Sequence, residues 1–126
     1  MRKPLTLLLL VLSLPLAGCA FLAGAAVVTA GVVYVQGEAK KIYPVPLDPA
    51  FQATTKAMES LDLVILEQKH DGAGWYLRSR RPFDAAEVHV RVVPSGEHAS
   101  QVGVRVGVTG DRVYSERLLE AIDQCL

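Results

Sequence analysis

The chain has 126 residues, which fits one domain, and 51% of them are hydrophobic. It carries 13 basic and 13 acidic residues, so its formal net charge at pH 7 is zero. Such a balance produces no strong electric field and excludes nucleic acid as an expected partner.

The first 18 residues have the organisation of a signal peptide. A basic tip at Arg2 and Lys3 precedes the leucine-rich run Leu5–Leu16, which is too short to span a membrane comfortably as a permanent helix. The run ends in Leu16-Ala17-Gly18-Cys19, which resembles the lipobox of bacterial lipoproteins. We therefore predict a signal peptide over residues 1–18.

A lipobox implies export, a diacylglyceryl thioether on Cys19 Sγ, cleavage after Gly18 and acylation of the new amino terminus. In the alternative, the whole uncharged stretch is a transmembrane anchor, but Pro15 and Gly18 divide it into two pieces of different composition. We favour lipidation of Cys19. Removal of the signal leaves 11 basic residues against 13 acidic ones, a net charge of −2.

Residues 19–37 are predicted to form an apolar tether rich in alanine, glycine and valine. Within the segment Ala20–Val35, Gly24 and Gly31 are seven positions apart, which in a helix places them on one face. Small-residue faces let membrane helices approach closely. The segment therefore either lies in or on the bilayer beside the acyl chains, with pairing to copies of itself as a further option, or serves as a low-complexity spacer. Both interpretations stay open.

Residues 38–126 are predicted to form the folded domain. A first strand over Val33–Tyr43 leads into it and ends before Pro44. Asp48-Pro49 is typical of a helix start, and the helix buries one face. That face is expected to consist of Phe51, Thr55, Met58 and Leu61.

Strong alternation predicts the remaining strands. Valine alternates with polar or small residues over residues 88–92 and 102–108, with a polar loop between them. Shorter strands are expected around Leu63–Lys69 and Trp75–Arg81. A last helix begins at Gly110-Asp111 and buries Tyr114, Leu118, Ile122 and Cys125.

The element order is β-α-β-β-β-β-α. It predicts an α+β fold, with an antiparallel sheet of four to five strands and two helices on one face. The valine faces are expected to contact the helices, and the opposite face carries Tyr76, Arg78, Arg80, His89, Arg91 and Arg105.

That opposite face is the candidate binding site. Arginine binds carboxylate or phosphate through a forked pair of hydrogen bonds, so Arg78, Arg80, Arg91 and Arg105 form a candidate anion site. Antiparallel sheets also commonly leave one face in water, and nearby acids such as Asp84 and Glu87 would neutralise part of the charge. We favour this solvated interpretation, although the sequence leaves the choice open.

Other chemistry is not predicted. His70, His89 and His98 do not have metal-ligand spacing, no serine has a nucleophile motif, and no glycine-rich phosphate loop is present. We expect no cofactor, no metal and no enzymatic activity. Cys125 is interpreted as a small apolar residue on a helix, the alternative being a reactive thiol.

The domain resembles a known family at Tyr43-Pro44, at Leu47-Asp48, at Gly74, at the Arg80-Arg81 strand end and at Val104–Asp111. It is similar to a family of small bacterial lipoproteins catalogued as a domain of unknown function, which joins a lipobox and an Ala/Gly-rich segment to this domain. The resemblance implies localisation and fold, and carries over no catalytic residue. Ala20 stands where enteric lipoproteins retained in the inner membrane have aspartate, which favours the periplasmic face of the outer membrane.

Three functions follow in order of preference. The first is a lipid-anchored protein of the cell envelope with a structural role or a protein partner, including self-association through Ala20–Val35. The second is a module that binds an anionic lipid head group, lipopolysaccharide or peptidoglycan through its arginine face. An enzyme comes last.

Overall fold

The fold is α+β, as the sequence predicts. The computed structural model describes residues 27–29 and 31–126. Cys19 and the signal peptide therefore lie outside the described residues. In chain order the elements are β1 (Val27–Thr29), β2 (Val32–Val35), β3 (Glu38–Tyr43), α2 (Leu47–Ser60), β4 (Val64–Asp71), β5 (Gly74–Arg80), β6 (Glu87–Pro94), β7 (Ser100–Val106) and α3 (Arg112–Cys125).

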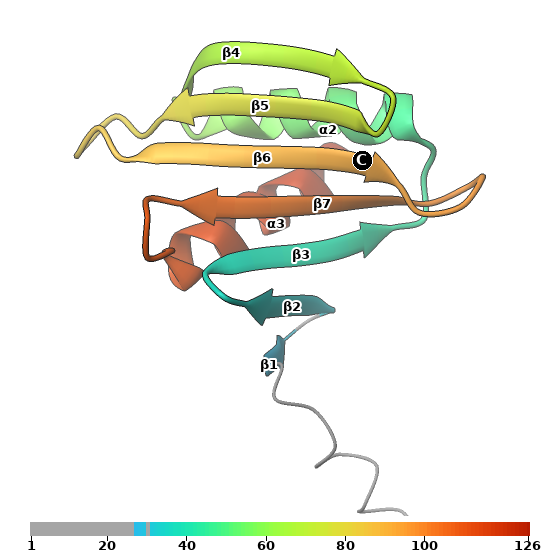
Figure 1. Ribbon diagram of the computed structural model, residues 1–126, viewed down its shortest axis with the longest axis horizontal. Helices are drawn as coiled ribbons and strands as arrows, with labels where there is room; N and C mark the ends of the chain where they lie inside the picture. The colour runs from blue at the N-terminus through green and yellow to red at the C-terminus, as the bar shows by residue number, and fades with distance from the viewer. Residues whose placement is uncertain (1–26, 30) are drawn as a thin grey trace, which may run out of the picture.

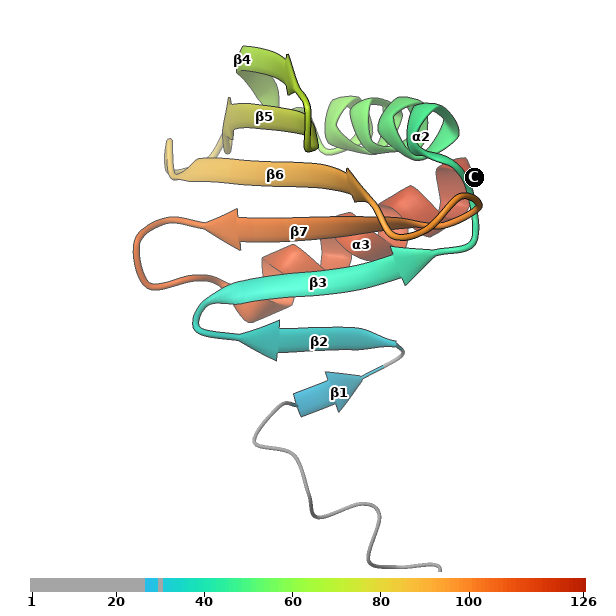
Figure 2. The same cartoon turned by 45° about the vertical axis from the view of Figure 1, so that its right-hand side comes forward.

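The strands form one antiparallel sheet in the order β1-β2-β3-β7-β6-β5-β4. The strands β4 to β7 follow one another as a meander, and β3 pairs with the free side of β7. Both helices lie on the same face of this sheet (Figures 1 and 2). The opposite face, which we call the open face, has no helix over it.

The core lies between the sheet and the helices. Alternate valines of β6 and β7 point into it and are at most 3% exposed, among them Val90 and Val104. They meet Leu118 and Ile122 of α3, which are fully buried. Tyr43 ties β3 to α3, because its hydroxyl donates to the carbonyl of Leu119 at 2.7 Å. Burial, assisted by the nearby charge of Asp123, raises the pKa of Tyr43.

The sheet has seven strands among the described residues, so the prediction of four to five was too low. The single strand predicted over Val33–Tyr43 is a hairpin of β2 and β3. Gln36 and Gly37 between them have φ values of 53° and 83°, and two successive positive φ angles reverse the chain tightly. Glutamine is a rare residue in that position, so the turn was not recognised in the sequence.

The sheet also begins before residue 38, where the domain was predicted to start. Val32 of β2 is 6% exposed and belongs to the core, and Gly31 has a φ of 80° outside any helix. For the described part of Ala20–Val35, the interpretation as a helical small-residue face is therefore wrong. Pairing with β3 gives the backbone N–H and C=O groups of β2 hydrogen-bond partners, which favours a strand there.

Helix α2 buries Met58 as predicted, but alanines complete its buried face in place of Phe51, Thr55 and Leu61. Ala50, Ala53, Ala57 and Met58 are at most 2% exposed, whereas Phe51 is only half-buried and stacks on Trp75 at 3.9 Å between ring centroids. The alanines are small, which lets α2 approach the sheet and α3 closely. The helix begins at Leu47, and no side chain caps it.

Candidate functional site

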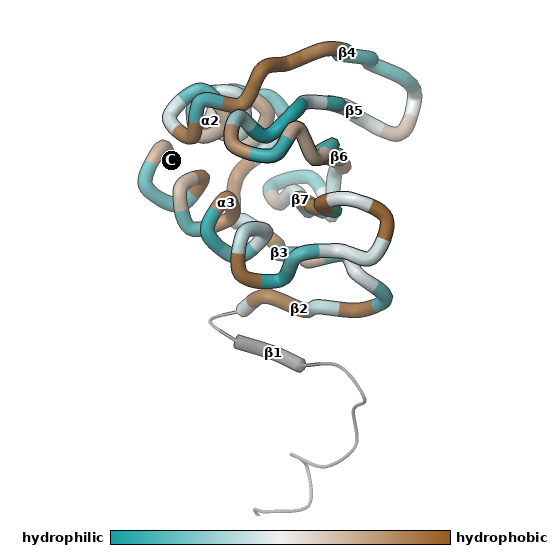
Figure 3. The backbone as a smooth tube through the Cα atoms, turned by 90° about the vertical axis from the view of Figure 1, so that its left-hand side faces the viewer, coloured by the Kyte–Doolittle hydropathy of each residue, from teal (hydrophilic) through white to brown (hydrophobic). Residues whose placement is uncertain are grey.

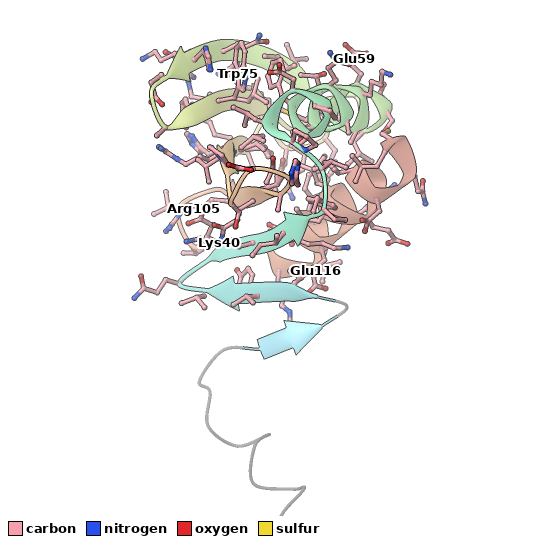
Figure 4. The ribbon with its side chains drawn as sticks, turned by 90° about the vertical axis from the view of Figure 1, so that its right-hand side faces the viewer. Lys40, Glu59, Trp75, Arg105 and Glu116 are labelled. Carbon is pink, nitrogen blue, oxygen red and sulfur yellow. The ribbon has the colours of Figure 1, made fainter. Side chains whose placement is uncertain are left out.

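The open face brings polar side chains of β3, β5, β6 and β7 together. The strand register places Arg78 beside His89, and His89 beside Arg105. Figure 1 looks onto this face. In Figure 4, Arg105 and Lys40 project on the side away from the helices, whereas Glu59 lies on the helical side. Alternation along the strands therefore assigned the candidate residues to the correct face.

Arg78 is neutralised by two glutamates. Its Nε donates to Glu67 Oε2 at 3.2 Å and its Nη1 donates to Glu87 Oε1 at 3.3 Å. Lys69 also contacts Glu67, at 2.8 Å. Hydrogen bonds from Lys69 and from Arg78 lower the pKa of Glu67. Arg78 thus offers a ligand little uncompensated charge.

Arg105 and Arg80 do not share the glutamate partners of Arg78. Arg105 donates to the carbonyl oxygens of Gln36 at 3.2 Å and of Val108 at 2.8 Å. These bonds join the β2–β3 turn to the loop after β7. Arg80 is the last residue of β5 and lies opposite Val64. The structure therefore does not gather the four predicted arginines at one point.

Arg91 is the arginine of this set that remains available within a cavity. Its guanidinium carbon lies 5.7 Å from the centre of the Tyr76 ring, a cation–π distance. No carboxylate pairs with it among residues 31–126. An arginine with open donors is suited to bind carboxylate or phosphate.

Next to Arg91, His89 is held on both ring nitrogens. The Tyr76 hydroxyl lies 2.5 Å from Nδ1, and Glu87 Oε2 lies 3.2 Å from Nε2. Both nitrogens are therefore engaged within the protein. This arrangement orients the imidazole but leaves neither nitrogen directed at a ligand.

The open face is hollowed over Gly103. The cavity has a volume of about 440 Å³, and Val90, Gly107 and Val108 complete a lining whose polar side chains are Glu38, Tyr76, His89, Arg91 and Arg105. Gly103 lies in its floor, and the Glu38 carboxylate reaches over this position, where a Cβ would collide with Oε1. A smaller hollow of about 80 Å³ continues past Lys40 and Gln101. The site thus presents Arg91 beside Gly103 and the Glu38 carboxylate over it.

A second polar cluster, which sequence reasoning missed, surrounds Arg81. The Arg81 side chain is only 8% exposed. It donates to both carboxylate oxygens of Asp84 and, at 2.8 Å, to Asp111. Its guanidinium carbon lies 4.4 Å from the centre of the Phe83 ring and 4.7 Å from that of Tyr114. The signal was alternation: Leu77 and Ser79 lie on the buried side of β5, and Arg81 continues this alternation one residue beyond the strand. A charge on that side requires partners.

The Arg81 cluster lowers the pKa values of two aspartates. Hydrogen bonds from Arg81, with one from the backbone of Ala86, lower the pKa of Asp84 to about 2. Arg81 and the backbone N–H of Tyr114 lower the pKa of Asp111. Asp111 is also the N-cap of α3. The cluster therefore joins the end of β5 to the start of α3 and has a structural role.

In the part of the chain that the structure describes, no three His, Cys, Asp or Glu side chains gather as metal ligands. Cys125 is half-buried and unpaired. Neither α2 nor α3 is long and apolar enough to cross a membrane.

These features define a small α+β domain with a polar cavity on the open face of its sheet. The chain belongs to DUF3568, a family of proteins of unknown function, whose sequence pattern matches residues 3–125. The family confirms the resemblance that the domain motifs suggested. No curated protein matches the chain.

Proposed function

We propose that the protein is a lipoprotein of the bacterial cell envelope, anchored through acylated Cys19. The observation that carries this proposal is Leu16-Ala17-Gly18-Cys19 at the end of an apolar run that follows Arg2 and Lys3. Because Ala20 is not aspartate, the expected location is the periplasmic face of the outer membrane. In this position the domain has a structural role or binds another envelope protein.

Binding through the open face is favoured over catalysis. His89, the strongest acid–base candidate on this face, has both ring nitrogens engaged by Tyr76 and Glu87. The cavity beside it presents Arg91 and Glu38 over a glycine floor. Charges of opposite sign around a hollow suit complementary polar groups of a partner.

A second candidate function is binding of an anionic envelope ligand. The specific observation is the guanidinium of Arg91, which lines the cavity without a carboxylate partner in residues 31–126. The ligand would offer a carboxylate or phosphate group, as lipid head groups, lipopolysaccharide and peptidoglycan do. Because Glu67 and Glu87 neutralise Arg78, the proposed anion contact centres on Arg91 and not on a patch of four arginines.

The anchor is tested by radioactive palmitate labelling in the native host. Cys19→Ser should abolish the label and leave unprocessed precursor, whereas Cys125→Ser should retain full labelling. Cys125 is the matched control because it is the other cysteine of the chain. Equal labelling of the two variants would contradict the lipoprotein proposal.

The binding surface is tested with a photo-crosslinking amino acid in intact cells. Lys40 lies on the open face and Lys56 on α2, and both are exposed. A residue introduced at Lys40 should give discrete adducts that the same residue at Lys56 does not give. Arg91→Met should weaken these adducts more than Arg80→Met. Adducts that are equal at Lys40 and Lys56 argue against the open face as the binding surface.

A further inference from the structure

Large apolar side chains are exposed at the end of the sheet where β5 and β7 finish and α3 begins. Phe83 is 71% exposed, Val113 79% and Val108 89%. We call these three residues the apolar tip. Single exposed apolar residues need no explanation, but a group of them on one end of a small domain marks a surface that contacts something apolar.

The three residues come from separate segments that the fold brings to the same end. The Phe83 ring meets Tyr114 edge-on at 6.2 Å, and Val113 precedes Tyr114 in the first turn of α3. The backbone N–H of Gly107 donates to the backbone carbonyl of Glu87 at 2.8 Å, which holds the loop of Val108 beside the start of β6. Figure 3 looks onto this end and shows apolar stretches in the loop beyond β7 and at the start of β4.

Contacts of Arg81 hold the apolar tip in its exposed position. Arg81 stacks on Phe83 while bound to Asp84 and Asp111. The Arg81 cluster therefore fixes the loop that carries Phe83 and the helix turn that carries Val113. An aromatic ring kept rigidly in water has no benefit for the isolated domain, because its burial would be favourable.

Val27, the first residue of β1, lies at this same end of the sheet. Val27 of β1 pairs with Tyr34, and Val35 pairs with Glu38 across the β2–β3 turn. That turn contacts the loop after β7, because Gly37 lies against Gly110. Figure 2 shows β1 starting below these loops. Only residues 20–26 separate Cys19 from Val27, and an extended chain of that length spans no more than about 30 Å.

We propose that the apolar tip docks into the bilayer surface that holds the acyl chains of Cys19. The tip then contacts the boundary between phospholipid head groups and acyl chains. Apolar protein surfaces insert into this boundary by about 5–10 Å. Arg80 is exposed at the same end, opposite Val64, where a cation suits lipid phosphates. Val108 also lines the cavity of the open face, so docking places the cavity rim near the head groups.

This inference rests on the proposed lipid anchor, and the experiment separates the two. Full-length acylated protein with Cys125→Ser is reconstituted into vesicles of phosphatidylethanolamine and phosphatidylglycerol. An environment-sensitive fluorophore is attached through Phe83→Cys, Val108→Cys or Val113→Cys, since acylation blocks Cys19. Quenching by doxyl groups on the lipid acyl chains then reports insertion. Mass spectrometry confirms that Cys19 carries lipid in every sample.

The matched control is Ile42→Cys, because Ile42 is 58% exposed on β3, at the opposite end of the sheet. Labels at the three tip positions should be quenched several-fold more strongly than the label at Ile42. Water-like emission at the tip in acylated protein overturns the docking proposal alone, whereas unacylated Cys19 overturns the anchor. A blue shift at the tip without lipid quenching also overturns docking, since it shows that a second copy covers the tip.

Discussion

Arg81 and Asp111 join two segments that are 30 positions apart in the sequence, with Arg81 Nη1 donating to Asp111 Oδ2 at 2.8 Å. The other oxygen of Asp111 accepts from the backbone N–H of Tyr114 at 3.1 Å. One carboxylate thus caps α3 and holds the end of β5. The orientation of α3 against the sheet depends in part on this single contact.

Substitution of Arg81 should destabilise the fold. Arg81→Met removes the hydrogen bonds to Asp84 and Asp111 and is expected to lower the free energy of unfolding by about 2 kcal/mol, a typical value for hydrogen bonds to charged groups. Urea denaturation followed by fluorescence of Trp75, the single tryptophan, measures the change.

The neighbouring Arg80→Met is the matched control for this measurement. Arg80 is exposed, and no carboxylate among residues 31–126 pairs with it. It should therefore change the free energy of unfolding by no more than about 0.5 kcal/mol. Equal effects of the two substitutions would show that the Arg81 cluster contributes nothing particular to stability.

The same cluster should make stability depend on pH in acid. The pKa of Asp84 is about 2 in the folded protein, below the value of about 3.9 for a free aspartate, and that of Asp111 is also lowered. A depressed folded-state pKa adds stability above the unfolded pKa, and this stability is lost as the pH falls toward the folded pKa. The difference in free energy of unfolding between the wild type and Arg81→Met should therefore shrink between about pH 4 and pH 2. A difference that stays constant over this range would contradict the assignment.

The alternation of apolar and polar residues along the chain predicted more of the structure than any other sequence signal. The valines of β6 and β7 point inward as expected, because a strand with one buried face must place apolar residues at every second position. The same rule placed Tyr76, His89 and Arg91 together on the open face. It could not show that Glu67 neutralises Arg78, because that contact depends on how two neighbouring strands pair.

Features made by long-range contacts or unusual backbone angles were missed. Arg81 meets Asp111 only after β5 and α3 pack, and the sequence spacing gives no sign of it. The turn at Gln36 lacks the Asn-Gly or Asp-Gly signal that marks such turns, so β2 and β3 were predicted as a single strand. The cavity over Gly103 arises where a strand position without a side chain meets Glu38 of another strand, a relation that one-dimensional patterns do not contain.

The assignment of β2 to the core leads to a second stability prediction. Val32 is 6% exposed and Val35 is 46% exposed on the same strand. Val32→Ala removes two buried methyl groups and should lower the free energy of unfolding by about 1–2 kcal/mol. Val35→Ala should change it by no more than about 0.5 kcal/mol. If β2 were a loose tether, urea denaturation would give equally small changes for both variants.

Substitution by alanine should affect stability much less at Gly103 than at Gly74, although both glycines lie in the sheet. The Cβ of Gly103→Ala collides only with the flexible end of Glu38, which can move aside, so the free energy of unfolding should change by less than about 1 kcal/mol. The Cβ of Gly74→Ala collides with the backbone carbonyl of Val92, and Gly74 has a φ of 136°. This variant should lose well over 1 kcal/mol. Because Gly103→Ala keeps the fold but displaces Glu38 over the cavity floor, it should also weaken the adducts from Lys40. Unchanged adducts in a stable Gly103→Ala protein would place the partner outside the cavity.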